Sequence, residues 1–436
     1  MKDKIMNNLL KVSTKIQAQR HMTAIKNAFT IMLPIIIIGS FCTLFTNVLC
    51  STQEGALSLA NIQGLAWLSK LAPIFSSINY ATMNLLALYA VVLIAYELCR
   101  HYEFKDRIMC SVISLGCYVS LCMTTITVES EGTSVLVQNV LSNTYTGVQG
   151  LFLAMIVACV VCECYVRLTK FEKLKIHMPE SVPSNIAAAF NALIPGLIIM
   201  LGVSTFGCLF ELVTNLSLFE AINLVIQKPL QGLLTGLPGY LFMFFMTTLL
   251  WFFGIHGTQV LKPIYQAALI AAVAENAEMV ANGQAATHIL NDAFRASFTT
   301  ITGAGVTGGL LIAIFLFSKR DDYRAIAKLG LPCAIFNINE PVIFGLPIVL
   351  NPILGIPFML APIVSASIGY VLTSVGFAKV MTVISPWTTP AGLQAFLNAG
   401  GDLNTGIAQI IAILATVLVY TPFVLISNKM EGKENV

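Results

Sequence analysis

Long apolar runs separated by short polar connections make up most of the 436-residue chain. A helix needs about 20 mostly apolar residues to cross a bilayer. The pattern therefore predicts an all-α polytopic membrane protein with about ten transmembrane helices. The predicted spans are residues 27–50, 81–99, 108–126, 148–166, 187–213, 237–255, 259–274, 299–318, 352–373 and 405–427.

Basic residues alternate in density between successive connections. The segments 100–107, 167–175 and 319–328 are rich in Lys and Arg, whereas 127–147 contains neither. Because cytoplasmic loops carry an excess of these residues, both termini are predicted to lie in the cytoplasm. The run 259–274 is shorter than the others, and it is counted as a span because the alternation requires one more crossing there.

The composition agrees with a bilayer location and excludes several other classes. Charged residues make up 10% of the chain, against about 25% in ordinary soluble proteins. Hydrophobic residues reach 57%, and the mean hydropathy is +0.82. A cytosolic enzyme, a secreted domain, a disordered chain and a nucleic-acid binder are therefore excluded. The sequence has no Walker A motif, so it is not expected to be the ATP-hydrolysing part of a pump, and no HExxH motif, so no zinc site is expected. We expect no cofactor and no metal.

Three stretches do not fit plain spanning helices. Residues 1–26 are basic, and Ile5, Leu9, Val12 and Ile16 would share one helix face, which predicts an amphipathic helix on the inner membrane surface. The stretches 329–351 and 375–400 are apolar but rich in Pro and Gly. They are predicted to form two re-entrant hairpins, because irregular backbone at membrane depth occurs where it is buried or lines a cavity.

Two ionisable residues are isolated in apolar surroundings. Glu340 is the one charged side chain between Leu329 and Ala378, and His256 is the one Asp, Glu, Lys, Arg or His between Pro229 and Leu261. Such groups are costly in a membrane and are read first as functional. The alternatives are an acid exposed at the membrane surface and a satisfied core histidine. Gln259 adds a polar group beside His256 and is counted as a binding candidate.

Other polar residues leave more than one interpretation. Trp387, within Ser385–Pro390, suits stacking on a sugar ring or anchoring at the membrane interface. Asp292, Arg295 and His288 are expected to be solvated in an outside connection. Glu163 and Arg167 are expected to form a local ion pair.

The eleven cysteines do not suggest a disulfide framework, because most fall within apolar runs. Cys159 and Cys162 form a CxxC with Cys164 nearby. The sequence around them contains no second pair and no His, so a structural role is favoured over a metal site.

Three motifs carry a family resemblance: WFFGIHG at 251–257, NINEPVIFGLP at 337–347 and SPWTTP at 385–390. They resemble the membrane (IIC) component of bacterial phosphoenolpyruvate-dependent sugar phosphotransferase systems, in the lactose/cellobiose/diacetylchitobiose branch. The similarity extends over nearly the whole chain. It implies a homodimer in the bacterial cytoplasmic membrane, with dimer contacts in an N-terminal half at 27–213. A connecting segment at 214–236 leads to a sugar-binding half at 237–428, and 429–436 form a cytoplasmic tail.

The resemblance also implies roles for single residues. Glu340 would lie at the sugar C6 hydroxyl that receives phosphate, with His256 beside it. Asn339 would bind a neighbouring hydroxyl. The resemblance assigns Trp387 to the sugar site less firmly than the other three. The implied function is import of a disaccharide of the cellobiose, diacetylchitobiose or lactose type, coupled to its phosphorylation. The phosphoryl donor would be a separate phospho-IIB protein with IIA upstream, because the 436 residues leave no room for either domain. Whether the chain itself counts as an enzyme is left open. The alternative is a cation-coupled disaccharide symporter.

Overall fold

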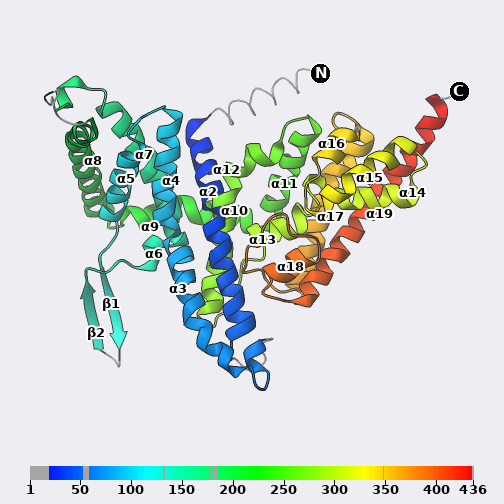
Figure 1. Cartoon of the computed structure of the whole chain (residues 1–436), viewed down its shortest axis with the longest axis horizontal. Coiled ribbons are helices and arrows are strands. Elements are labelled where there is room, and N and C mark those ends of the chain that lie inside the picture. Colours follow the sequence, from blue (N-terminus) through cyan, green and yellow to red (C-terminus); the bar gives the residue numbers. More distant parts are fainter. Residues whose placement is uncertain are drawn as a thin grey trace. The chain divides into compact units, whose positions relative to one another are not determined.

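The computed structural model describes residues 19–52, 58–130, 133–176, 179, 184–346 and 348–434 (Figure 1). Residues 1–18 of the predicted amphipathic helix, and Pro347 of the second motif, lie outside these described residues. The chain divides into two compact units. One contains residues 37–79 and 231–434 among those described, and the other contains 19–36 and 80–230.

The second of these units is a packed group of helices. Helix α4 packs on α5 and α7, and α8 packs on α5. The face of α4 with Leu86, Ala90, Ile94 and Leu98 is fully buried, as expected for apolar residues four apart in a helix. Its helices are the first part of α2 (Arg20–Phe45), α4 (Leu86–His101), α5 (Arg107–Ser120), α6 (Asn143–Thr146), α7 (Leu151–Leu168), α8 (Ser184–Thr214), α9 (Leu218–Ile222) and the start of α10 (Lys228–Thr235).

A β-hairpin replaces the end of one predicted span. Helix α5 ends at Ser120 instead of continuing to 126, and β1 (Thr125–Ser130) pairs antiparallel with β2 (Thr133–Gln138). Thr125 lies opposite Gln138. The stretch after the helix is rich in Thr, Val and Ile, whose branched side chains favour strands. The prediction of a helical span as far as 126 was therefore wrong at its end.

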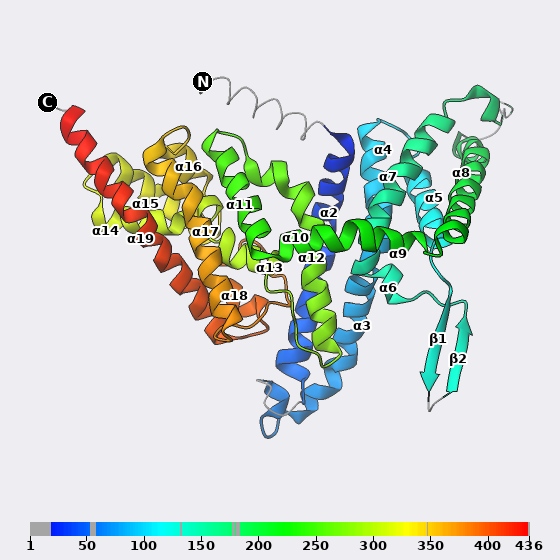
Figure 2. The ribbon, with the colours of Figure 1, turned by 180° about the vertical axis from the view of Figure 1, so that it is seen from behind.

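The other unit contains the second half of the chain. Helix α17 packs on α19 and α11, and α14 packs on α19, as both views show (Figures 1 and 2). Phe358 and Leu310 are fully buried in its core. Its helices are the second part of α2, most of α3 (Ala72–Thr82), the rest of α10, α11 (Leu237–Phe252), α12 (Gly257–Ala281), α13 (Asp292–Phe294), α14 (Thr307–Phe317), α15 (Asp321–Ile335), α16 (Glu340–Gly345), α17 (Pro352–Ser374), α18 (Leu393–Asn398) and α19 (Leu403–Glu434).

The helical membrane architecture is confirmed, whereas the number of ten spans stays a prediction. Within the described residues, seven helical stretches are long and apolar enough to cross a membrane, or eight with the bent pair around Gly236. The predicted span 299–318 is interrupted. A π-helical turn at Arg295–Thr299 is followed by a break in which Thr302, Gly303, Gly305 and Val306 all have positive φ before α14 begins.

The two predicted hairpins differ from each other. The first is helical: α15 and α16 lie side by side, joined by a turn that ends at Asn339 (Figures 1 and 2). The basic connection 319–328 is largely the beginning of α15, where Asp321 and Asp322 in the first turn complement the helix dipole. The second stretch, 375–400, runs without helix from Val375 to Gly392 and then forms α18.

Candidate functional site

The three motif segments meet in the unit that contains α11 to α19. The ring of Trp251 lies 6.3 Å from that of Phe344, which brings the first segment to α16. The backbone N–H of Leu350 donates to the carbonyl of Phe252 at 2.9 Å. Asn337 reaches the third segment by donating to the carbonyl of Trp387 at 2.6 Å. Contacts between residues 50 to 98 positions apart therefore join the three segments in one region.

His256 is held at the start of α12. Its Nδ1 accepts a hydrogen bond from the backbone N–H of Gln259 at 3.3 Å, so it serves as the N-cap of the helix. With Nδ1 accepting, the neutral ring carries its proton on Nε2. The ring also lies 4.2 Å from that of Trp251. His256 is half-buried and Gln259 is exposed.

Gly257 explains how the first segment can turn so closely. A Cβ atom at Gly257 would lie 1.9 Å from the carbonyl oxygen of Thr247, which no side chain tolerates. The close approach lets α12 begin directly against α11. Trp251 Nε1 then donates to Thr258 Oγ1 at 3.2 Å, and the indole is only 3% exposed. The tryptophan therefore fixes the histidine ring from one side.

Glu340 is the first residue of α16, and its side chain is exposed. Pro341 follows it, a residue type favoured at the first helical positions, and a carboxylate there interacts favourably with the helix dipole. Phe344 comes four residues later and therefore shares its helix face. Phe344 lies near Trp251, so α16 lies beside the ring that contacts His256, and a shared site for Glu340 and His256 stays a prediction. Exposure of the carboxylate suits a ligand contact and also suits a surface acid.

Asn339 has a different setting from its neighbour. Its side chain is 3% exposed, and Nδ2 donates to the carbonyl of Ala304 at 2.6 Å and to Thr307 Oγ1 at 2.8 Å. A Cβ atom at Gly303 would lie 2.1 Å from its Cγ. Asn339 thus anchors the start of α16 to the break before α14. A sugar contact by this residue stays a prediction.

Asn337 is the residue that sequence reasoning passed over. It adopts φ +65°, a conformation that asparagine tolerates better than most residues. Its Oδ1 accepts from the backbone N–H of Thr302 at 2.6 Å, while Nδ2 donates to the carbonyls of Trp387 and, at 2.9 Å, Thr389. One side chain therefore joins the first hairpin, the broken helix and the third motif. Its position in a tight Asn-x-Asn turn was the available signal.

Trp387 projects from the third segment and is 57% exposed. Beneath it, Gln394 is 1% exposed, and its Nε2 donates to the Trp387 carbonyl at 3.4 Å. The loop is fixed further by Asn398, whose Oδ1 accepts from the backbone N–H of Ser385 at 2.8 Å. A rigid loop that presents an exposed indole fits both interpretations of Trp387, stacking and interfacial anchoring.

The expectation of a solvated Asp292 and Arg295 was wrong. Arg295 Nε lies 2.7 Å from Asp292 Oδ1, and Nη2 donates to Oδ2 at 3.2 Å. Asp292 is 6% exposed. Arg295 Nη1 also donates to Thr300 Oγ1 at 3.1 Å, so the paired charges are satisfied within the protein. His288 lies 2.9 Å from Glu275 and is likewise paired.

The local ion pair of Glu163 with Arg167 is confirmed at 3.0 Å. His21 of α2 joins it, with Nε2 at 2.9 Å from the same carboxylate.

The long apolar helices define the class, a helical membrane protein, and comparison with known proteins gives its family. Residues 26–362 match the family described as Phosphotransferase system, EIIC. The chain belongs to this family, and it is a multi-pass integral membrane protein.

Three similar proteins span almost the whole chain. The cellobiose-specific EIIC component of Lactococcus lactis is 30% identical, over 98% of this chain and 97% of that relative. The lactose-specific EIICB component of Staphylococcus epidermidis is 26% identical, over 96% of this chain and 69% of that relative. The crystal structure of the transporter ChbC, the IIC component of the N,N'-diacetylchitobiose-specific phosphotransferase system, superimposes with a TM-score of 0.88 and 30% identity, over 98% of both chains.

Proposed function

We propose that the chain imports a disaccharide of the cellobiose, lactose or diacetylchitobiose type and releases it phosphorylated at the C6 hydroxyl. The observation that carries this proposal is the junction of the three motif segments at Trp251 and Asn337. The sugars named for the cellobiose-, lactose- and diacetylchitobiose-specific relatives support the substrate class.

The proposed chemistry is a phosphoryl transfer in which the permease positions the acceptor. The Glu340 carboxylate orients the C6 hydroxyl and accepts its proton as the oxygen attacks phosphorus. His256 donates from Nε2 to the sugar, since Nδ1 is used at the N-cap. Trp387 stacks on the apolar face of a ring, and Gln259 adds a hydrogen bond. Asn339 acts first by positioning Glu340, because its amide nitrogen donates to Ala304 and Thr307.

The phosphoryl donor comes from the partner components with which this family works, IIB and upstream IIA. Among the relatives, the name EIICB itself joins the C and B components, which supports contact between a IIB protein and the permease. For this chain we propose a separate phospho-IIB, both termini in the cytoplasm, and a homodimer with its contacts in residues 27–213. The segment 237–428 would be the sugar-binding half.

A 6-deoxy analogue of the transported disaccharide tests the coupling. It lacks the nucleophile, so phospho-IIB should not make it accumulate in liposomes containing the protein, although it should still exchange slowly. Its affinity should fall by about 1–3 kcal/mol, because a polar group of the site is left without a partner. A cation-coupled symporter would instead concentrate the analogue when an ion gradient is imposed. Accumulation of the unphosphorylated analogue would overturn the proposal.

A further inference from the structure

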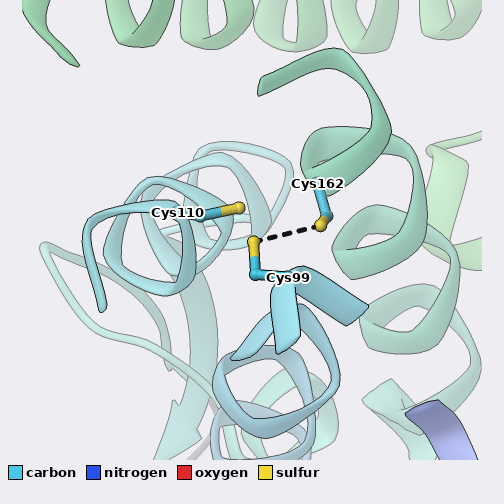
Figure 3. Close-up of side chains that lie close together, drawn as sticks. All are labelled: Cys99, Cys110 and Cys162. Carbon is cyan, nitrogen blue, oxygen red and sulfur yellow. Dashed lines mark hydrogen bonds between the residues drawn. The ribbon is translucent and has the colours of Figure 1, made fainter. Parts of the chain in front are cut away.

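Three cysteines from three different helices converge in the unit formed by α4, α5 and α7. The sulfur atoms of Cys99, Cys110 and Cys162 all lie within 4.8 Å of one another, and Figure 3 shows the side chains directed toward a common point. Cys99 Sγ and Cys162 Sγ are 3.3 Å apart. All three residues are fully buried. Only Cys162 belongs to the CxxC of the sequence, so the cluster is a product of helix packing.

The surroundings hold the three thiols in place. Cys99 lies near the end of α4 and Cys110 in the first turns of α5, and a short connection at 102–106 joins these helices. Phe104 of that connection packs edge-to-face on Tyr165 of α7 at 5.7 Å. Tyr165 is three residues beyond Cys162. The same ring contact therefore ties the α4–α5 turn to the helix that carries the third thiol.

A pocket lies near the α4–α5 connection, although the three cysteines themselves do not line it. The pocket, of about 340 Å³, is lined in part by Phe104, Asp106 and Tyr165. The hydroxyl of Tyr165 is buried and has no hydrogen-bond partner among the described residues. A buried polar group normally has a partner, so this hydroxyl is an exception on the helix that carries Cys162.

The net charge of the complex indicates which sulfur-binding ion the cluster would hold. Three thiolates around a divalent cation carry one net negative charge, and around a monovalent cation two, and burying such charge unpaired is unfavourable. Of the two nearby cations, Arg100 is paired with a carboxylate, whereas Arg107 is bonded to a neutral carbonyl. Arg100 lies 3.0 Å from the carboxylate of Glu97, and Arg107 Nε donates to the carbonyl of Phe104 at 3.1 Å. A trivalent centre bound to three thiolates is neutral and has no such penalty.

We propose that Cys99, Cys110 and Cys162 form a trithiol site for trivalent arsenic, entering as arsenous acid. Three S–As bonds form and three As–O bonds break. Each thiol proton leaves with a hydroxide, so As(OH)₃ and three RSH give As(SR)₃ and three waters, with no change of oxidation state. Arsenous acid is small and uncharged, as the apolar packing around the cluster requires. A pyramidal centre also brings its sulfurs closer together than a planar one, in keeping with the short Cys99–Cys162 separation.

Sodium arsenite added to the detergent-purified full chain tests this site. Elemental mass spectrometry should find one arsenic atom per chain. X-ray absorption spectroscopy at the arsenic edge should show three sulfur atoms bound to it. The variants Cys99→Ser, Cys110→Ser and Cys162→Ser should each lower arsenite affinity at least tenfold and leave two sulfur neighbours. Cys164→Ser and Cys208→Ser are matched controls, because both residues are exposed, and they should bind as the unmodified protein does.

A second measurement does not depend on the folding of variants. Since the three thiols are buried, alkylation is followed during heating toward the melting temperature, and bound arsenite should delay modification of Cys99, Cys110 and Cys162 while Cys164 and Cys208 react as before. It should also raise the melting temperature by linking three helices. Arsenic on cysteines outside the cluster, lack of protection, or displacement of arsenite by equimolar Zn²⁺ or Cu⁺ would overturn the proposal. A Cys99–Cys162 disulfide in protein kept under reductant would overturn it too.

Discussion

Asn337 donates from its side-chain amide to the backbone carbonyl of Trp387 at 2.6 Å, which joins two motif segments fifty positions apart. The same amide group also accepts from Thr302 and donates to Thr389. Carbonyls and N–H groups of irregular backbone need partners inside the protein, and a single asparagine supplies three of them. The loop that presents Trp387 is therefore positioned by a residue of the hairpin that presents Glu340.

Removing this amide should loosen the junction. In Asn337→Gly the new glycine tolerates the positive φ of this position, but the three side-chain hydrogen bonds are lost. Each of these bonds contributes about 0.5–1.5 kcal/mol to stability. We expect a lower melting temperature in detergent and weaker sugar binding by calorimetry. Asn337→Ala adds strain at the positive φ and should be less stable than the glycine variant. Wild-type sugar affinity in Asn337→Gly would show that the junction does not shape the site.

Glu340→Gln should stop sugar phosphorylation while the protein stays folded, because the amide keeps the size of the side chain but accepts no proton from the C6 hydroxyl. The exposed position of Glu340 predicts little change in stability. Formation of radiolabelled sugar phosphate in the presence of phospho-IIB is the measurement. Glu211→Gln, also at an exposed carboxylate, is the control and should retain activity. Full activity of a monodisperse Glu340→Gln protein contradicts the assigned role.

His256→Ala should weaken sugar binding by about 1–3 kcal/mol, the range for a polar partner lost from a buried site. Part of the effect comes from the lost N-cap, which contributes about 1 kcal/mol to helix stability. Asn at position 256 restores a capping side chain without the imidazole, so His256→Asn separates the two contributions. Titration calorimetry on both variants, with His288→Ala as a control, measures them. If His256→Ala and His256→Asn bind the sugar as tightly as the His288→Ala control does, the role of His256 is purely structural.

The Asp292–Arg295 pair should dominate local stability. Breaking a buried ion pair by removing one partner costs about 3–5 kcal/mol, so Asp292→Asn should lower the melting temperature strongly. Asp322 and Arg320 form a pair at the same distance, 2.7 Å, but Asp322 is half exposed. Exposed pairs contribute about 0–1 kcal/mol, and Asp322→Asn is the matched control. Similar losses in the two variants would argue against burial of the first pair.

The pH dependence of the Asp322 contribution has a definite sign. The hydrogen bond from the Arg320 side chain is the leading cause that lowers the pKa of Asp322 from its ordinary value. A lowered pKa in the folded state means that the contribution is present above the unfolded pKa of about 3.9 and is lost as the pH falls toward the folded value. The stability difference between the unmodified protein and Asp322→Asn should therefore shrink below about pH 4, as followed by thermal melts. A difference that grows on acidification would contradict the assigned direction.

Topology is open to direct labelling. The charge pattern places 127–147 outside and 319–328 inside. On a cysteine-free background, a membrane-impermeant thiol reagent added to intact cells should label Thr133→Cys, at the start of β2, and leave Asp321→Cys, at the start of α15, unreacted. Permeabilised cells, in which both should react, are the control. The reverse pattern would invert the proposed orientation.

Local sequence was enough to find the class of protein and its two isolated ionisable residues. Apolar length decides that a segment enters a bilayer, and the solvation cost of charge makes Glu340 and His256 conspicuous within such segments. These are properties of a residue and its near neighbours. For the same reason, the helical character of nearly every predicted span was correct.

Only the tertiary structure decided which distant residues meet. The Asp292–Arg295 pair reads as polar and solvated in sequence, yet packing buries it with its hydrogen bonds satisfied. Asn337 became a junction because the broken helix and the third motif fold back on it. Cys99, Cys110 and Cys162 look like scattered small hydrophobes, and they converge because α4, α5 and α7 pack together. Contacts of this kind depend on how the helices are placed relative to one another. The periodicity of apolar residues along one helix shows which face is buried, but it does not determine that placement.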